Sequence, residues 1–126
     1  GIIYPKLHYG RDALVGIALF LALLVDKKCK VSKLKGQYSE YFMKKIKITL
    51  EDSNLIDRSF KVIAENYSEL SPNTEDGVRI DFEDAWVHMR KSNTEPIIRI
   101  FAEANSQDIA DSYALKIEKE IKSISA

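Results

Sequence analysis

The sequence has 126 residues, of which 45% are hydrophobic and 30% are charged, so it can bury one ordinary core, and its composition excludes a disordered chain. The formal net charge is zero, but residues 1–50 carry 10 Lys and Arg against 3 Asp and Glu, whereas residues 51–126 carry 9 against 16. The single cysteine, Cys29, excludes an internal disulfide framework and a cysteine-based zinc site, and it predicts a reducing compartment, the cytoplasm.

The first 27 residues predict a strand followed by a helix. Residues 1–4 have the pattern of the end of a buried strand, and residues 11–27 are helical and apolar nearly all round, which predicts burial on several sides. The apolar run 13–25 has 13 residues, short of the roughly 20 that span a bilayer, so no membrane partner is expected. Residues 1–27 are therefore interpreted as a strand-helix remnant of an α/β domain, with possible self-association through the helix at 11–27.

Residues 28–43 are predicted to connect this remnant to a second unit, residues 44–126. The pattern becomes regular from Lys45, where alternating apolar residues predict a half-buried strand over 45–50. A helix follows, with its apolar face at Ile56, Phe60 and Ile63.

Three more strands are predicted at 78–82, 86–90 and 97–104. The last helix is predicted to begin near Ser106, with a four-residue apolar stripe at Ile109, Tyr113, Ile117 and Ile121. The order β-α-β-β-β-α predicts an α+β fold, in which two helices cover one face of an antiparallel, four-stranded sheet.

The segment 90–96, with sequence RKSNTEP, lies between the third and fourth predicted strands. A phosphate dianion is bound by several N–H and O–H donors that converge from different directions, together with a guanidinium fork. Ser92 and Thr94 supply hydroxyls, Asn93 an amide and Arg90 the fork, while Pro96 helps to fix the end of the loop. Ser, Asn, Thr and Pro are also common turn residues, so an ordinary hairpin is the alternative.

The string RKSNTEP, followed by IIR and then AEA, resembles the phosphate-binding loop of the α-D-phosphohexomutase superfamily. That superfamily includes phosphoglucomutases, phosphomannomutases and phosphoglucosamine mutases. Segment 76–82 and the hairpin around Trp86 resemble its fourth domain, whose fold is similar to half of a TATA-binding protein, and residues 1–14 resemble the end of its third domain. The resemblance implies that residues 1–27 end a third domain and that residues 44–126 are the C-terminal phosphate-binding domain.

The resemblance also implies roles for individual residues. It assigns contact with the substrate phosphate to Arg90, Ser92, Asn93 and Thr94, and a loop-shaping role to Glu95, Pro96 and Arg99. Lys91 occupies a variable position and receives no role. His8 and His88 are set aside as acid–base candidates, because no partner for either is evident in the sequence.

Members of this family move a phosphoryl group between the 1- and 6-positions of a hexose such as glucose, mannose or glucosamine. They use a phosphorylated serine, Mg²⁺ and a hexose 1,6-bisphosphate. Neither the serine motif nor the Asp-rich metal loop occurs in these residues, so no catalytic or metal-binding residue is assigned and the chain is expected to be inactive alone. The expected partners are a phosphosugar and the remaining domains of the same enzyme.

Two other functions stay open. One is a non-catalytic module that binds a small ligand or a nucleic acid through the basic half. Few aromatic residues lie among the lysines to stack on bases, so the preferred interpretation includes no nucleic-acid partner. The other is an oligomerisation piece built around the helix at 11–27.

Overall fold

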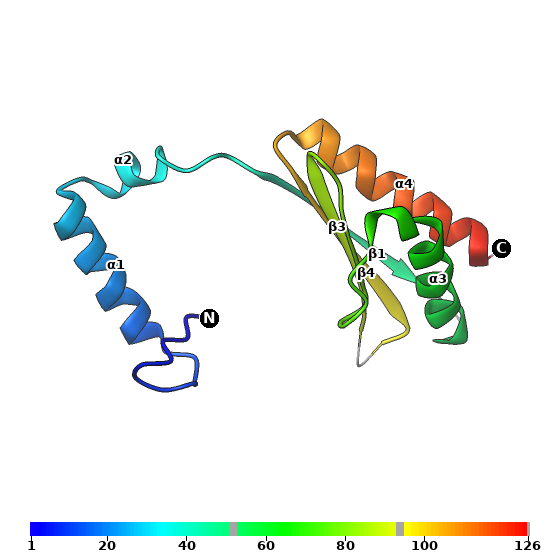
Figure 1. The fold of residues 1–126 in the computed structure, drawn as a ribbon, viewed down its shortest axis with the longest axis horizontal. Helices are drawn as coiled ribbons and strands as arrows, with labels where there is room; N and C mark the ends of the chain where they lie inside the picture. Colours follow the sequence, from blue (N-terminus) through cyan, green and yellow to red (C-terminus); the bar gives the residue numbers. More distant parts are fainter. Residues whose placement is uncertain (51–52, 93–94, 126) are drawn as a thin grey trace. The chain divides into compact units, whose positions relative to one another are not determined.

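The computed structural model describes residues 1–50, 53–92 and 95–125, and it divides the chain into two compact units, Gly1–Ser39 and Glu40–Ala126 (Figure 1). The first contains two helices, α1 (Ala13–Lys27) and α2 (Val31–Lys35).

Helix α1 begins and ends close to its predicted bounds. The Asp12 carboxylate accepts a hydrogen bond from the backbone N–H of Val15 at 3.0 Å, and this bond, helped by His8, lowers the pKa of Asp12. No residue of α1 is buried. Among the described residues, no helix combines the length and the apolar character that crossing a membrane requires.

The strand predicted over residues 1–4 is wrong. Those residues are exposed, and they make an isolated bridge from Tyr4 to His8 and a hydrogen bond from Asp12 N–H to the carbonyl of Ile2. A strand is defined by hydrogen bonds to a neighbouring strand. The apolar residues Ile2 and Ile3 predicted burial, but these residues join no sheet in the structure.

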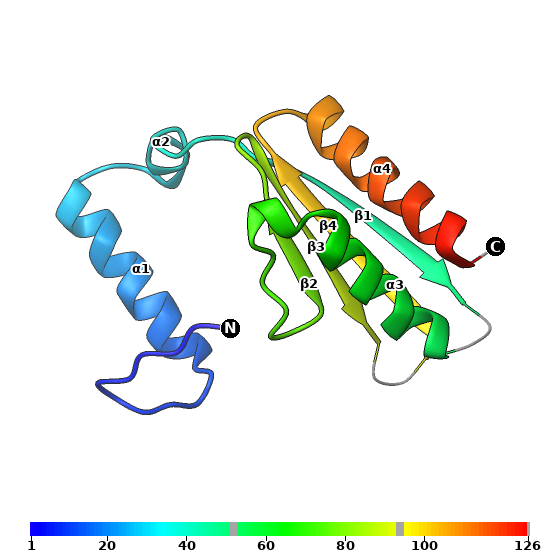
Figure 2. The same cartoon turned by 45° about the vertical axis from the view of Figure 1, so that its right-hand side comes forward.

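The second unit is an antiparallel, four-stranded sheet with the strand order β1-β4-β3-β2 (Figure 2), which confirms the predicted α+β fold. The first strand begins three residues earlier than predicted. The strands are β1 (Phe42–Thr49), β2 (Val78–Asp81), β3 (Ala85–Lys91) and β4 (Ile97–Ala104), and the helices are α3 (Ser53–Asn66) and α4 (Gln107–Ser125).

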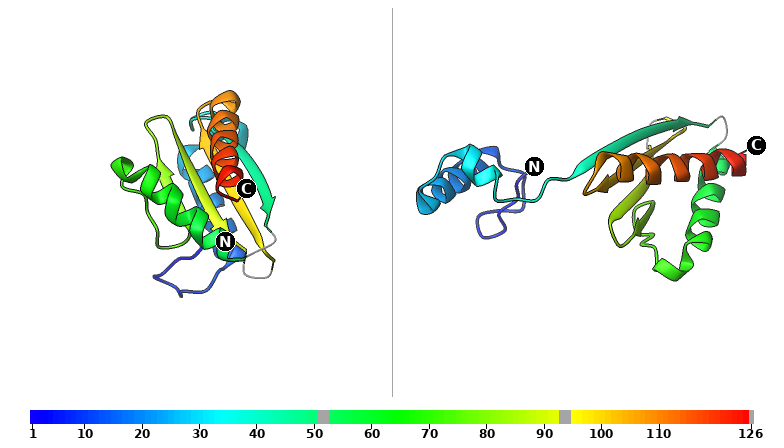
Figure 3. Two further views of the ribbon diagram at one scale, coloured as in Figure 1. Left: turned by 90° about the vertical axis from the view of Figure 1, so that its right-hand side faces the viewer. Right: turned by 90° about the horizontal axis from the view of Figure 1, so that it is seen from above.

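The two faces of the sheet differ because side chains alternate along each strand. On one face, apolar side chains from all four strands are buried, among them Ile48, Ile80, Met89 and Ile100. Helices α3 and α4 lie on this face (Figure 3). The opposite face is called the open face here, because neither helix of this unit covers it.

The helices pack on the sheet through the apolar stripes that the sequence predicted. Ile56 and Ile63 of α3 and Ile117 and Ile121 of α4 are fully buried in the same core. Tyr67, just after α3, donates a hydrogen bond of 2.7 Å to the Glu120 carboxylate, so burial and this bond together raise the pKa of its hydroxyl.

We predict that residues 44–126 fold autonomously, because the core and the apolar side chains packed against it are built from residues 46–124. Deleting residues 1–35 should leave both the circular dichroism spectrum of the second unit and its cooperative thermal transition in place. Loss of that transition in the truncated chain would place the domain boundary elsewhere.

Candidate functional site

The segment 92–96 joins β3 to β4, the two central strands of the sheet. Its entry and exit are therefore held on both sides by strand neighbours. Two of its predicted phosphate ligands, Asn93 and Thr94, lie outside the described residues.

Backbone hydrogen bonds fix both ends of this segment. Ser92 N–H donates to the carbonyl of Ile97 at 3.0 Å, and Ile97 N–H donates to the carbonyl of Glu95 at 2.8 Å. The carbonyl of Pro96 accepts a hydrogen bond of 3.0 Å from Leu50 N–H, just after β1. These bonds tie the two ends of the segment to β4 and to the residue after β1.

Arg90 and Lys91 are consecutive in β3 and point to opposite faces of the sheet. Arg90 lies on the open face, where its Nη2 is 2.8 Å from a carboxylate oxygen of Asp76. Lys91 lies on the helix face, and its Nζ is 3.1 Å from a carboxylate oxygen of Asp57 in α3. Of these two cations at the start of the loop, Arg90 alone is on the open face. Ser92 is buried, with 9% of its surface exposed.

A row of basic residues crosses the open face at the loop end of the sheet. Lys47 of β1 is directly opposite Arg99 of β4, and Arg99 is directly opposite Arg90 of β3. Paired residues of neighbouring strands have Cβ atoms roughly 5 Å apart. Two carboxylates offset part of this charge, since Glu95 lies 3.8 Å from Lys47 Nζ and Asp76 lies 2.8 Å from Arg90 Nη2. Three cations against two carboxylates leave a positive charge in excess beside the segment 92–96.

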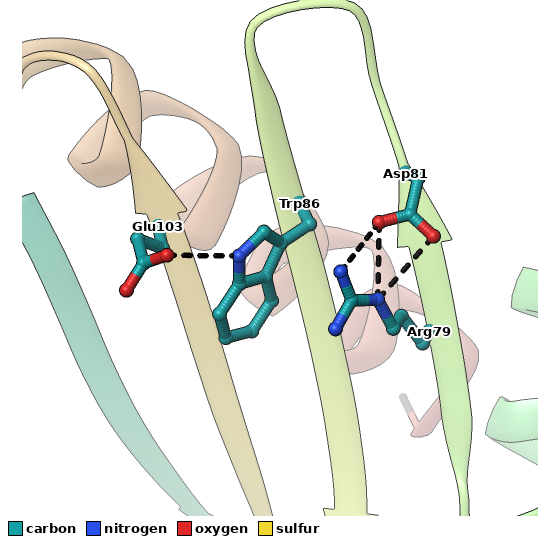
Figure 4. A network of polar contacts seen from close by, with 4 residues as sticks. All are labelled: Arg79, Asp81, Trp86 and Glu103. Atoms are coloured by element: carbon teal, nitrogen blue, oxygen red, sulfur yellow. Dashed lines mark hydrogen bonds and ion pairs between the residues drawn. The ribbon is translucent and has the colours of Figure 1, made fainter. Parts of the chain in front are cut away.

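The other end of the open face carries a self-contained polar network, shown in Figure 4. The Arg79 guanidinium lies 4.7 Å from the centre of the Trp86 ring and donates to the Asp81 carboxylate at 2.7 Å, which raises the pKa of Arg79. Trp86 Nε1–H donates to Glu103 at 3.1 Å. This network has one guanidinium against two carboxylates, so this end of the open face lacks the positive character of the loop end.

Both histidines have partners that the sequence did not reveal. His88 Nε2 makes a hydrogen bond of 2.7 Å to the backbone carbonyl of Asp76, and His8 Nε2 lies 3.0 Å from the Asp12 carboxylate. The expectation that neither had a partner is wrong. The His88 contact is with a backbone carbonyl, which is a structural role for the ring.

The described residues contain no group of three or more His, Cys, Asp or Glu side chains placed to hold a metal ion. A hollow of about 650 Å³ borders α3 on the helix side of Lys91, and its lining includes two lysines, Lys61 and Lys91, and three acidic residues, Asp57, Glu65 and Asp76. These carboxylates outnumber the lysines and would repel a phosphate dianion. The loop end of the open face suits an anion better than this hollow does.

Sequence reasoning missed two acidic partners of the site, Asp76 and Asp57. The position of Asp76-Gly77 immediately before a predicted strand was a signal that it would lie beside the neighbouring strand. Nothing in the local pattern of α3 indicated that Asp57 would meet Lys91.

Comparison with known proteins identifies the family of the chain. Residues 28–120 match the family model described as the phosphoglucomutase/phosphomannomutase C-terminal domain. The phosphoglucosamine/phosphogalactosamine mutase of Sulfurisphaera tokodaii is 36% identical over 121 residues, which cover 94% of this chain and 27% of that protein. The phosphoglucomutase/phosphomannomutase of Thermococcus kodakarensis is 36% identical over 119 residues, covering 90% of this chain and 25% of that protein.

Solved structures show the same fold. A crystal structure of the Aspergillus fumigatus N-acetylphosphoglucosamine mutase with GlcNAc-6P and magnesium aligns with a TM-score of 0.60 and 17% identity, covering 91% of this chain and 22% of that one. A variant of that enzyme in complex with glucose 1,6-bisphosphate aligns with a TM-score of 0.63 and 15% identity, covering 94% and 22%. The chain belongs to the phosphoglucomutase/phosphomannomutase family and contains its C-terminal domain. It spans about a quarter of the length of the two relatives compared above.

Proposed function

We propose that this chain is the phosphate-anchoring domain of a phosphohexomutase, an enzyme that interconverts the 1-phosphate and the 6-phosphate of a hexose. The segment 90–96 holds the substrate phosphate. The observation that carries the proposal is the position of Arg90, whose guanidinium lies at the entry to this segment and on the open face, in line with Arg99 and Lys47.

The chemistry of the segment fits a phosphate. Arg90 supplies a planar fork of donors, and Ser92 supplies a hydroxyl. Asn93 and Thr94 join them on the strength of the sequence resemblance alone. The neighbouring cations Arg99 and Lys47 add long-range attraction for a dianion.

Such an anchor suits a reaction in which the sugar binds in two orientations. Donors that contact only the phosphate do not distinguish the carbon that carries it, so the same residues receive the 1-phosphate and the 6-phosphate. The phosphorylated serine and Mg²⁺, as well as any residue that distinguishes glucose, mannose and glucosamine, belong to other domains of the proposed enzyme.

We predict that this 126-residue chain binds glucose 1-phosphate and glucose 6-phosphate with similar affinity and does not bind glucose. Titrations followed by amide NMR would measure this, and the shift changes should concentrate in residues 90–99. Lys91→Ala is the matched control for Arg90→Ala, because it removes a neighbouring positive charge from the opposite face of the sheet.

The alternative, a module that binds nucleic acid through its basic residues, makes a different prediction. It requires oligonucleotide affinity that falls steeply with salt and shift changes that spread over Lys45, Lys47 and the lysines of residues 27–35. Such a result, together with no response to the hexose phosphates, would contradict the proposed function.

A further inference from the structure

Asp76 lies outside the segment 90–96, but its carboxylate contacts Arg90, the residue proposed to bind the phosphate. Its carboxylate oxygen is 2.8 Å from Arg90 Nη2, although 14 residues separate the two in the sequence. Both side chains are more than half exposed, with 68% of Asp76 and 51% of Arg90 accessible to solvent. Ion pairs this exposed add little to the stability of a fold, so stability alone does not account for the arrangement.

The backbone holds Asp76 in place from a second direction. Gly77 has a φ of +77°, and a Cβ at this position would overlap the carbonyl oxygen of Met89 and stand 3.2 Å from the Cα of Arg90. A glycine is therefore required for the chain to pass this close to β3. The ring of His88 also holds the backbone carbonyl of Asp76 at 2.7 Å. The hydrogen bond from His88 and the close approach of Gly77 to β3 thus place the Asp76 carboxylate beside Arg90, independently of the Arg90 side chain.

The contact leaves most of the guanidinium for a ligand. Arginine has five N–H donors, and the Asp76 contact uses the terminal nitrogen Nη2. A free arginine side chain has many rotamers, and fixing one of them before the ligand arrives lowers the entropy lost on binding. A carboxylate near an anion site weakens the binding of a dianion by repulsion. The Asp76 carboxylate can offset this cost if it orients the Arg90 guanidinium for the ligand.

We propose that Asp76 is a positioning residue for Arg90. It holds the guanidinium through one nitrogen, in the orientation from which the remaining N–H groups receive the substrate phosphate. His88 and Gly77 fix Asp76 for this purpose. The inference rests on the proposed function, since it assumes that Arg90 binds phosphate.

Two measurements on the 126-residue chain test it. The first, made without ligand, is the side-chain ¹⁵N relaxation of the Arg90 Nε–H group, which reports how freely the guanidinium moves. The second is the affinity for glucose 6-phosphate by NMR titration. Asp76→Ala should increase the motion of Arg90 and weaken binding by roughly 2- to 10-fold. Asp76→Glu, which keeps the carboxylate of the ion pair, should retain most of the restraint on Arg90 and most of the affinity.

Asp81→Ala is the matched control. It removes one negative charge from the same open face, but its carboxylate pairs with Arg79. It should leave the motion of Arg90 unchanged and should not weaken phosphate binding. Thermal midpoints of the variants should stay close to that of the parent chain, which separates positioning from a loss of structure.

The possible failures are distinguishable. Tighter phosphate binding by Asp76→Ala would mean that the carboxylate acts through repulsion, and unchanged motion of Arg90 would mean that Asp76 does not hold it; either result overturns the inference. Undiminished binding by Arg90→Ala would instead overturn the proposed function, whatever Asp76 does to the motion of the arginine.

Discussion

Replacing Arg90 by alanine is expected to lower kcat/KM of the complete enzyme about 10- to 100-fold, with similar losses for the 1-phosphate and the 6-phosphate. A hydrogen bond to a charged group contributes roughly 1.5–3 kcal/mol, which corresponds to that factor in affinity. Arg90→Lys should recover only part of the loss, because an ammonium does not reproduce the planar fork. Steady-state kinetics in both directions of the reaction would measure these effects.

Lys91→Ala is the control for this experiment, since Lys91 pairs with Asp57 on the helix face. It should change kcat/KM little. The fold should survive both alanine changes, because each side chain is partly exposed and lies at the end of a strand. An unimpaired Arg90→Ala enzyme, or a larger effect from Lys91→Ala, would show that the segment 90–96 has been misinterpreted.

The second large effect is expected from Gly77→Ala, which should lower the free energy of unfolding of the second unit by about 3 kcal/mol or more. An L-residue at a φ of +77° costs roughly 1–2 kcal/mol, and the new Cβ would also overlap the Met89 carbonyl oxygen. Relief of this overlap requires β2 to move away from β3. For a domain of this size the midpoint of thermal unfolding should fall by roughly 12 °C or more.

Gly36→Ala is the comparison for this change. Gly36 has a φ of −66°, and the nearest atom to an added Cβ would be 3.6 Å away, so alanine fits without strain. It should leave the thermal midpoint of the second unit where it is. A Gly77→Ala chain that unfolds together with the unchanged chain would mean that the approach of residue 77 to β3 is not required by the fold.

The regular elements were predictable because each has a clear period. Alternation at Ile46 and Ile48 predicted a strand, and the four-residue stripe that includes Ile117 and Ile121 predicted a helix; all four side chains pack in or against one core. The segment at 1–4 was mispredicted because a short apolar run has no period of its own. Apolar character there indicated burial, but it did not indicate a partner strand.

The site was predictable only as far as its residues are neighbours in sequence. The placement of Arg90 at a strand end and of Lys91 on the other face follows from the alternation of β3. The contacts of Arg90 with Asp76 and of Lys91 with Asp57 bridge 14 and 34 residues, respectively. Such contacts depend on strand order and helix placement, which local periodicity does not encode.

The position of the segment 92–96 between the two central strands has a mechanical consequence. A pull on a phosphate held there would be shared among the ladders that join β3 to β2, β3 to β4 and β4 to β1. A force on a ligand bound at an outer strand would act on one ladder of hydrogen bonds, which could break one bond at a time. A force on a ligand bound between β3 and β4 would act on all three ladders together. The sheet and the two helices packed on it would therefore move with the ligand as one rigid body.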